Sequence, residues 1–190
     1  MLTASNSLME ATDRVIEIGC GPGTYTMPIA AGCRHLVALD SSPAMLGRLS
    51  ERIAARGVHN VDVRWGRLPD RLGEGAFDGL LAAGVLDYMA DLELALAAVR
   101  AAVRPGGWMV LTVPLARSAA RPTAALEGVV RRRAYARRAD EVVNAAVAAG
   151  LELRGMESVG LARRGRTLVV RAVRRPSGGS CPRCSKLPPP

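Results

Sequence analysis

The stretch Val15-Ile16-Glu17-Ile18-Gly19-Cys20-Gly21-Pro22-Gly23 decides the fold of this 190-residue chain. A short run that favours a β-strand leads directly into three glycines on alternate positions, and helix-compatible sequence follows from Thr24. Such a segment predicts a buried strand that turns sharply into a helix. The glycines let a ligand approach the backbone and the open N–H groups at the start of the helix.

The next apolar run ends in Asp40, 21 residues after Gly19. An acid at the tip of a second strand is placed to bind two ribose hydroxyls. The loop and this acid together predict a nucleoside-binding site.

The glycine spacing favours a ligand other than a dinucleotide. In the dinucleotide fingerprint G-x-G-x-x-G, the third glycine permits close helix–strand packing under a pyrophosphate. The corresponding position here is Thr24, and the glycines follow the pattern Gly19-x-Gly21-x-Gly23. Glu17, two residues before the loop, would oppose a diphosphate but suits a cationic ammonium group.

Length and composition indicate one domain with an aliphatic core. The chain has 49% hydrophobic but only 3% aromatic residues, and no apolar run approaches the length of a membrane span. We expect a short segment over 1–13, a single domain over 14–175 and a disordered tail over 176–190. The N-terminus lacks the pattern of a secretory signal, so we expect a cytoplasmic protein.

The four cysteines do not form a disulfide framework, because two lie in the nucleoside half and two in the tail. This distribution fits a reducing compartment. Cys181-Pro182-Arg183-Cys184 has the spacing of half a zinc site, but no second pair lies near it in sequence, and four ligands are normally needed. We predict no metal and leave the role of Cys181 and Cys184 open.

The net charge of +9 comes from the C-terminal third of the chain. Residues 1–116 carry a net charge of −2, whereas residues 117–175 carry +9 and the tail adds +2. Such a region attracts nucleic acid, anionic lipid or a phosphorylated substrate. However, 25 Arg stand against a single Lys, which also fits a coding bias that places Arg on solvated faces.

Strand and helix patterns alternate from residue 14 to residue 114, which is typical of a doubly wound, mostly parallel sheet with helices on both faces. We expect seven strands, the last two forming an antiparallel hairpin around Arg163-Arg164-Gly165-Arg166. The predicted strands are 14–18, 36–40, 61–65, 77–83, 108–113, 151–159 and 167–173. The predicted helices are 24–31, 43–56, 91–103 and 140–149.

The span from Val15 to Arg174 resembles the class I S-adenosylmethionine-dependent methyltransferases, in particular the type 11/12-like small-molecule domain. Val15–Gly23 resembles their motif I, and Leu36-Val37-Ala38-Leu39-Asp40 resembles the second motif. Ser42-Pro43-Ala44-Met45-Leu46 is similar to a common helix start of the family. Residues 77–86 resemble the fourth-strand motif, and 103–107 resemble the turn before strand five.

The resemblance implies S-adenosylmethionine as cofactor and methyl transfer as the reaction. It also implies a Rossmann-like fold. The glycines of motif I would pack against the methionyl part and ribose, Glu17 would support the loop or the methionyl ammonium, and Asp40 would bind the ribose. Other residues would line the adenine or approach the methionyl end. The implied cofactor-binding residues are Glu17, Gly19, Cys20, Gly21, Gly23, Asp40, Ser41, Met45, Gly66, Arg67, Ala83 and Gly84.

This chain departs from the family in two places. Many relatives carry an acid after strand three, where this chain reads Gly66-Arg67. Either Arg67 stacks on or beside the base, or Asp70 substitutes for the acid. Only 14 residues precede Val15, whereas most relatives have a longer segment that covers the cofactor. The short segment leaves three alternatives: the cofactor site is unusually open, the chain is shortened, or the activity is impaired.

The sequence leaves the catalytic residues unknown. Asp87 and Tyr88 follow strand four and are the candidates nearest the expected methyl group. His35 and His59 precede strands, which puts them at the edge away from the carboxyl ends, where open α/β sheets bind ligands. No N/D-P-P-Y/F/W tetrapeptide and no Pro-Cys nucleophile occur, so we favour a small-molecule methyl acceptor.

Two alternatives from other classes stay open. An RNA-associated methyltransferase would use Arg131–Arg138 as a phosphate surface, although only Tyr135 offers an aromatic stacking partner there. Nucleic acid is therefore not the favoured partner. A non-catalytic cofactor-binding or partner protein would fit the short N-terminus and Arg67. The sequence does not indicate the oligomeric state.

Overall fold

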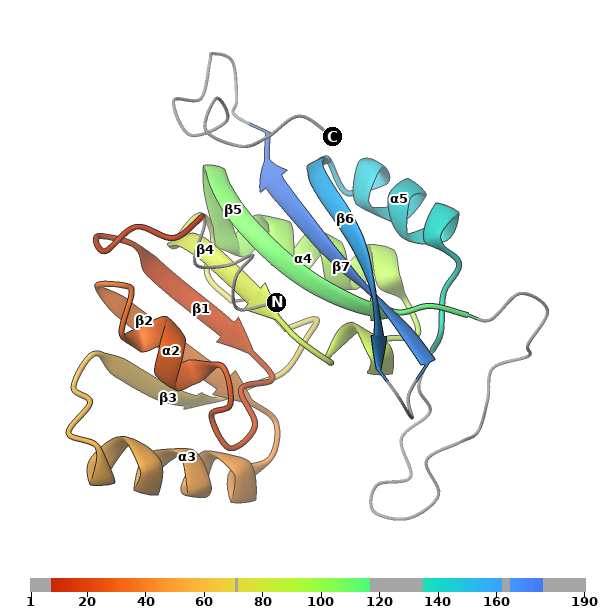
Figure 1. Cartoon of the computed structure of the whole chain (residues 1–190). Coiled ribbons are helices and arrows are strands. Elements are labelled where there is room, and N and C mark those ends of the chain that lie inside the picture. Colours follow the sequence, from red (N-terminus) through yellow and green to blue (C-terminus); the bar gives the residue numbers. More distant parts are fainter. Residues whose placement is uncertain (1–7, 71, 117–134, 162–164, 176–190) are drawn as a thin grey trace.

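The computed structural model describes residues 8–70, 72–116, 135–161 and 165–175. Strands and helices alternate through the first half, and two long strands end the described chain (Figure 1). The strands are β1 (Arg14–Ile18), β2 (His35–Asp40), β3 (Val61–Trp65), β4 (Phe77–Ala82), β5 (Val103–Pro114), β6 (Leu151–Leu161) and β7 (Gly165–Arg174). The helices are α2 (Thr26–Ala30), α3 (Pro43–Ala55), α4 (Leu92–Ala102) and α5 (Ala139–Ala148), with a 3₁₀ turn, η1 (Leu86–Tyr88).

The seven strands form one sheet in the order β3-β2-β1-β4-β5-β7-β6. The first five are parallel, while β7 runs antiparallel to both β5 and β6. The predicted seven-stranded, doubly wound sheet with a closing hairpin is therefore confirmed. The chain reverses its winding between β1 and β4, which is the place where such sheets bind ligands, at the carboxyl ends of the strands.

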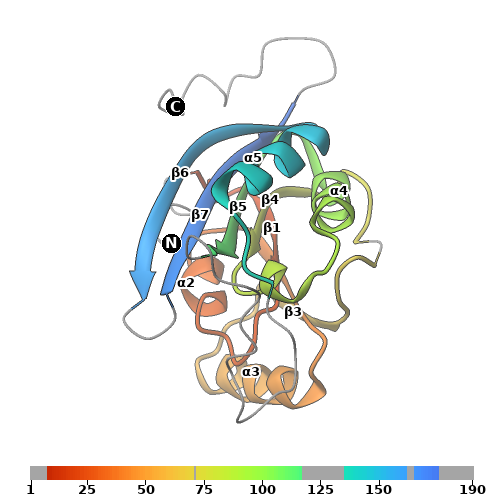
Figure 2. The ribbon, with the colours of Figure 1, turned by 90° about the vertical axis from the view of Figure 1, so that its right-hand side faces the viewer.

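Helices cover both faces of the sheet (Figure 2). On one face, α4 and α5 bury Leu96 and Val142 against alternate residues of β1, β4 and β5, such as Ile16 and Leu80. On the other face, α2 packs against a second cluster that includes Val15, and α3 packs beside it over β2 and β3. The period-two alternation of the central strands thus places apolar side chains on both faces of the sheet, in one cluster under α4 and α5 and in two clusters under α2 and α3.

Several boundaries differ from the predicted ones. The helix expected from Thr24 begins at Thr26, because the chain is still turning after Gly23, whose φ is 90°. Pro28 is its third residue, where a missing N–H breaks no helical hydrogen bond. β5 begins at Val103, and its register to β4 shifts over the predicted Arg104–Gly107 turn. The turn expected over 163–166 lies partly outside the described residues.

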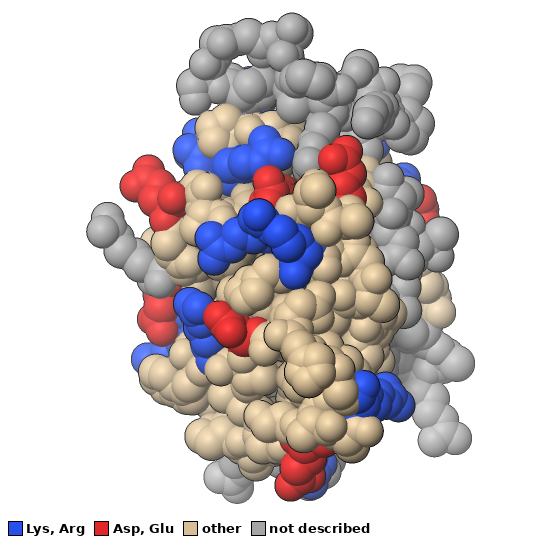
Figure 3. Space-filling model, turned by 90° about the vertical axis from the view of Figure 1, so that its left-hand side faces the viewer, with Lys and Arg blue, Asp and Glu red and all other residues tan. Residues whose placement is uncertain are grey.

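The amino ends of the strands are held by buried and half-buried acids. The Asp78 carboxylate accepts a hydrogen bond from the backbone N–H of Arg14 at 2.7 Å and one from Arg104 Nε at 2.6 Å. The indole Nε1 of Trp108 donates to Asp13 Oδ2 at 3.0 Å, and both side chains are buried. Basic and acidic side chains are interspersed over the face of the molecule that Figure 3 shows.

We predict that Gly79→Ala destabilises the protein by about 1–3 kcal/mol, the usual cost of overpacking. A Cβ at Gly79 would lie 2.1 Å from Cε2 of the buried Trp108 ring. Gly47→Ala is the matched control, because a Cβ there meets nothing within 4 Å on the exposed side of α3. That change should stabilise the helix by roughly 0.5–1 kcal/mol. Urea unfolding of both variants measures the difference, and equal effects would contradict the packing argument.

Candidate functional site

The glycine loop between β1 and α2 lies at the carboxyl end of the sheet. Gly19, Gly21 and Gly23 have φ values of 71°, 53° and 90°, which L-residues with a side chain rarely adopt. The N–H groups of Gly19 and Cys20 both donate to the carbonyl of Leu39, at 2.7 and 3.1 Å. The loop is therefore anchored to the end of β2.

The three glycines differ in what surrounds them. A Cβ at Gly19 would lie 2.2 Å from Val85 Cγ2, and one at Gly23 would lie 2.5 Å from Leu49 Cδ1. These two glycines permit close packing within the protein. A Cβ at Gly21 would meet nothing within 4 Å, and the same holds for Gly84 after β4, whose φ is 67°. Gly21 and Gly84 are the positions of this edge that face open space.

The Asp40 carboxylate joins the loop to the start of α3. Its Oδ2 accepts a hydrogen bond from the N–H of Gly21 at 2.9 Å, and its Oδ1 accepts one from the N–H of Ser42 at 2.8 Å. The backbone carbonyl of Asp40 also accepts from the N–H of Gly66 at 3.1 Å. Each carboxylate oxygen keeps acceptor capacity for a further donor. Asp40 thus connects three of the predicted site segments.

The Glu17 carboxyl lies beneath the loop and is 1% exposed. The hydroxyl of Thr26, itself fully buried, donates to Glu17 Oε2 at 2.5 Å. Burial raises the pKa of Glu17 to about 7; the Thr26 hydrogen bond opposes this rise and the nearby Asp40 charge adds to it. Sequence reasoning missed Thr26, because the predicted helix begins at Thr24 and no local pattern pairs this hydroxyl with the acid nine residues earlier.

Cys20 is the loop residue between the first two glycines, and its side chain is buried. Burial, followed by the nearby Glu17 and Asp40 charges, raises the pKa of its thiol to about 12. The thiol therefore stays protonated at neutral pH and is a poor nucleophile. Its contact with Ala38 and Leu49 makes it part of the small core under α3.

The residues predicted to line an adenine lie around the ends of β2 and β3. Ser41 and Met45 are half-buried beside Asp40, Gly66 is buried, and Arg67 is exposed. A Cβ at Gly66 would lie 2.7 Å from Leu39 Cδ1, so close packing accounts for this glycine. Trp65, which no sequence argument singled out, is 64% exposed, and its Nε1 donates to the carbonyl of Ser41 at 3.2 Å.

The turn after β4 is held by β5. Ala83 is half-buried and Gly84 is exposed, and the N–H of Gly84 donates to the hydroxyl of Thr112 at 2.8 Å. Thr112 is buried at 6% exposure. Its side chain fixes the backbone at Gly84. The next residue, Val85, is the one against which Gly19 packs. Sequence reasoning missed Thr112, because nothing local marks a strand threonine as a loop support.

A segment far along the chain clamps η1, which holds the two catalytic candidates. Asp87 is half-buried and Tyr88 is 44% exposed. The N–H of Tyr135 donates to the carbonyl of Asp87 at 2.6 Å. Arg137 Nη2 donates to the carbonyls of Met89 and Ala90 at 2.6 and 3.0 Å. The segment around Tyr135 and Arg137 therefore belongs to the wall of this edge.

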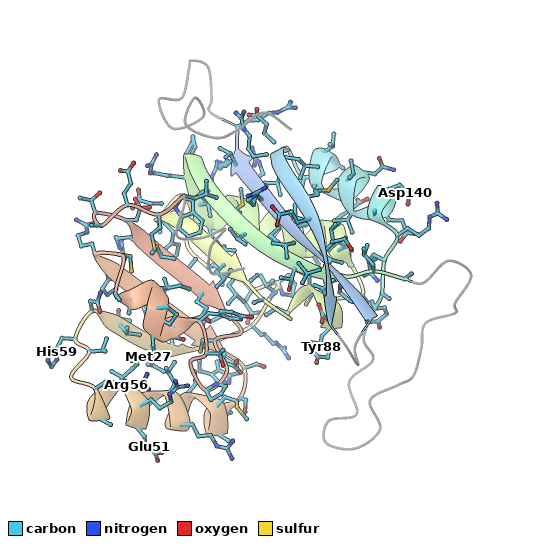
Figure 4. All side chains as sticks on the ribbon, in the orientation of Figure 1. Met27, Glu51, Arg56, His59, Tyr88 and Asp140 are labelled. Atoms are coloured by element: carbon cyan, nitrogen blue, oxygen red, sulfur yellow. The ribbon has the colours of Figure 1, made fainter. Side chains whose placement is uncertain are left out.

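The two histidines lie away from this edge. His35 is the first residue of β2, where its Nε2 lies 3.5 Å from Asp62 Oδ2. His59 precedes β3, and Figure 4 shows it at the end of the sheet opposite Tyr88. The described residues contain no group of three or more His, Cys, Asp or Glu side chains that could hold a metal ion. Cys181 and Cys184 lie outside the residues described.

Of the five arginines considered as a phosphate surface, the structure describes Arg137 and Arg138; Arg131, Arg132 and Arg133 lie outside the described ranges. Arg137 is engaged with backbone carbonyls and lies over the ring of Tyr135, 5.2 Å from its centroid. The Arg138 guanidinium pairs with Asp140, Nε to Oδ1 at 3.0 Å. Arg137 is thus held by carbonyls of the chain, whereas Arg138 forms an exposed ion pair on the surface.

Residues 16–109 match the family model described as a methyltransferase domain. The chain is 36% identical over 96 residues to a ubiquinone biosynthesis O-methyltransferase of Rhizobium etli. The aligned region covers 50% of this chain and 38% of that protein. The chain thus spans well under half the length of this relative.

No helix among the residues with described positions is long and apolar enough to cross a membrane.

Two solved structures show the same fold. An S-adenosylmethionine-dependent methyltransferase from Mesorhizobium loti has a TM-score of 0.73 at 21% identity, over 90% of this chain and 96% of that one. The cyclase SpnF has a TM-score of 0.75 at 19% identity, over 93% and 80% of the two chains. The chain belongs to the class I S-adenosylmethionine-dependent methyltransferase family, as its sequence motifs predicted.

We predict that the buried Glu17 makes stability fall as the pH rises. Because its pKa in the folded protein lies above the usual 4.5, the folded chain holds this proton more tightly than the unfolded chain. The carboxyl contributes fully below pH 4.5, and this contribution is lost as the pH rises through about 7.

Between pH 5 and pH 8, the free energy of unfolding of the wild type should fall by about 2–3 kcal/mol relative to Glu17→Gln. Chemical denaturation of both proteins across this range measures the difference. Parallel stability profiles would show that the pKa of Glu17 is not raised.

Proposed function

We propose that this protein binds S-adenosylmethionine at the carboxyl edge of β1, β2 and β4 and transfers its methyl group to a small-molecule acceptor. The observation that carries the proposal is the Asp40 carboxylate bridging the glycine loop and the start of α3, with open space at Gly21 beside it. An acid in this position suits the two hydroxyls of a ribose.

The residues present fit the chemistry of this cofactor. Open space at Gly21 and Gly84 leaves backbone on both sides of the edge free of side-chain cover. Glu17 is a buried acid, and no basic side chain of the described ranges pairs with it. A buried carboxylate without a cation is costly, whereas a sulfonium and an ammonium group bring positive charge to it. In this proposal the backbone around the site is shaped by Gly19, Cys20, Gly23 and Ala83. The adenine is bordered by Ser41, Met45, Gly66 and Arg67.

The bound cofactor supplies a methyl group on a sulfonium sulfur, which is already an activated leaving group. The chain then has to orient an acceptor in line with that bond and exclude water, and positioning of this kind supplies a large part of a rate enhancement. Tyr88 lies in η1, just after the turn that follows β4, and the backbone N–H of Tyr135 donates to the carbonyl of Asp87 beside it. We assign them to the acceptor side, with Asp87 as the candidate for accepting a proton where the acceptor must lose one.

A small molecule is the proposed acceptor because the curated relative is an O-methyltransferase of ubiquinone biosynthesis. An acceptor with an ionisable hydroxyl would therefore be the first class to screen. The alternative of an RNA acceptor gains no support from Arg137 and Arg138, because carbonyls and Asp140 already engage their guanidinium groups. A cofactor-binding protein without catalysis differs from the proposal in one result, cofactor binding with no methyl transfer to any acceptor.

We predict that Asp40→Ala weakens S-adenosylmethionine binding by roughly 1.5–3 kcal/mol, the loss expected for hydrogen bonds to a charged group. The change removes the ribose acceptor and also releases the N–H of Gly21. Asp62→Ala is the matched control, because Asp62 is a surface acid paired with Arg64 on β3. Isothermal titration calorimetry measures both affinities. Unchanged affinity in Asp40→Ala would refute the ribose assignment.

We predict that a side chain at Gly21 blocks the cofactor. Gly21→Ala and the larger Gly21→Val place atoms in the open space beside Asp40, and Gly21→Val should abolish binding. Gly57→Ala serves as control, because Gly57 has a similar φ of 60° but lies in the turn after α3. Both alanine variants lose stability from backbone strain, and only the Gly21 variants should lose affinity. Retained binding in Gly21→Val would mean that the loop is purely structural.

A further inference from the structure

The contacts of Glu17 point to a role for Thr26, the first residue of α2. Thr26 is fully buried, and its hydroxyl donates to Glu17 Oε2 at 2.5 Å. This hydrogen bond connects the end of β1 to the start of α2, on either side of the glycine loop. A valine of nearly the same shape would fill this buried position without needing a hydrogen-bond partner, whereas a buried hydroxyl is costly without one. The side-chain choice is therefore explained by what it does to Glu17.

Among the described residues, the groups around Glu17 are acidic or apolar, and no basic side chain pairs with it. On β2 its register partner is Ala38, and Asp40 lies two residues further along the same strand. On β4 its register partner is Leu81. The loop contributes the Cys20 thiol, whose pKa is raised to about 12, so that it stays uncharged. Thr26 is the contact that favours the ionised form of Glu17, while burial and Asp40 favour the neutral form.

We propose that Thr26 is a positioning residue of the cofactor site, which holds Glu17 so that this carboxyl group releases its proton when the positively charged cofactor binds. The inference rests on the proposed function, because it takes S-adenosylmethionine as the cation. The balance of the step is simple. The neutral Glu17 carboxyl loses one proton to solvent and becomes a carboxylate, and the sulfonium and ammonium charges of the ligand stabilise it. No bond of the cofactor changes in this step.

Proton release gives the first test, and it needs no variant. Calorimetric titration of the wild type with S-adenosylmethionine at pH 6.5, in phosphate and in Tris, measures the protons released from the difference in buffer ionisation enthalpy. A carboxyl group that titrates at about 7 should release about three-quarters of a proton on full ionisation. At this pH an α-amino group is still largely protonated, so the ligand itself contributes little. Glu17→Gln should release none.

The pH dependence of affinity tests Thr26 itself. For the wild type, the affinity should rise about eightfold between pH 6 and pH 7.5, as linkage to a single group that titrates at about 7 requires. Thr26→Val removes the hydrogen bond that favours the carboxylate, so this rise should move to higher pH and the affinity at pH 7 should fall. Thr26→Ser keeps the hydroxyl and should restore the wild-type profile. Thr24→Val, at an exposed threonine of the same segment, should leave the profile unchanged.

The outcomes separate the two proposals. If the wild type binds no cofactor at millimolar concentration, the proposed function fails, and this inference fails with it. If the wild type binds cofactor without releasing a proton, the proposed function stands and the role of Glu17 ionisation is refuted. If Thr26→Val binds with the wild-type pH profile, the positioning role of Thr26 is refuted even where Glu17 releases its proton. A purely structural Thr26 would change stability but leave the pH profile in place.

Discussion

The hydrogen bonds of the Asp40 carboxylate are the interaction on which this edge of the molecule depends. In a parallel sheet, each strand ends at the same edge and each crossover begins there, so the turns need a common support. Asp40 provides it by accepting the N–H of Gly21 from one crossover and the N–H of Ser42 from the next. Both N–H groups lie in turns where no strand partner satisfies them. The glycine loop and the start of α3 are therefore positioned together.

The opposite side of the same edge is built from residues distant in sequence. β5 supplies Thr112, which fixes the turn at Gly84, and the segment before α5 supplies Arg137, which binds the carbonyls of Met89 and Ala90. The reversal of winding between β1 and β4 places these supports next to the glycine loop. The contact between Gly19 and Val85 thus joins the cofactor half of the proposed site to its acceptor half.

The fold and the chemistry are supported by different observations. Solved structures of this fold include a methyltransferase and a cyclase, so the sheet order alone does not select a reaction. The reaction class comes from the family match. The proposed cofactor site adds a buried Glu17, with which no basic side chain of the described residues pairs, beside an open glycine. Burial raises the pKa of this acid, and acids with perturbed pKa values cluster at functional sites.

The sequence by itself determined the alternating elements, the sheet class and the residues that meet at its carboxyl edge. These features follow from local patterns: period-two apolar runs, glycines at positive φ and an acid at a strand end. Only the tertiary structure decided which glycine of the loop faces open space, that Thr26 binds Glu17, and that Arg137 binds the carbonyls of Met89 and Ala90 just after η1. Those roles depend on which neighbours surround a side chain, and neighbours distant in sequence are set by packing, which no local pattern encodes.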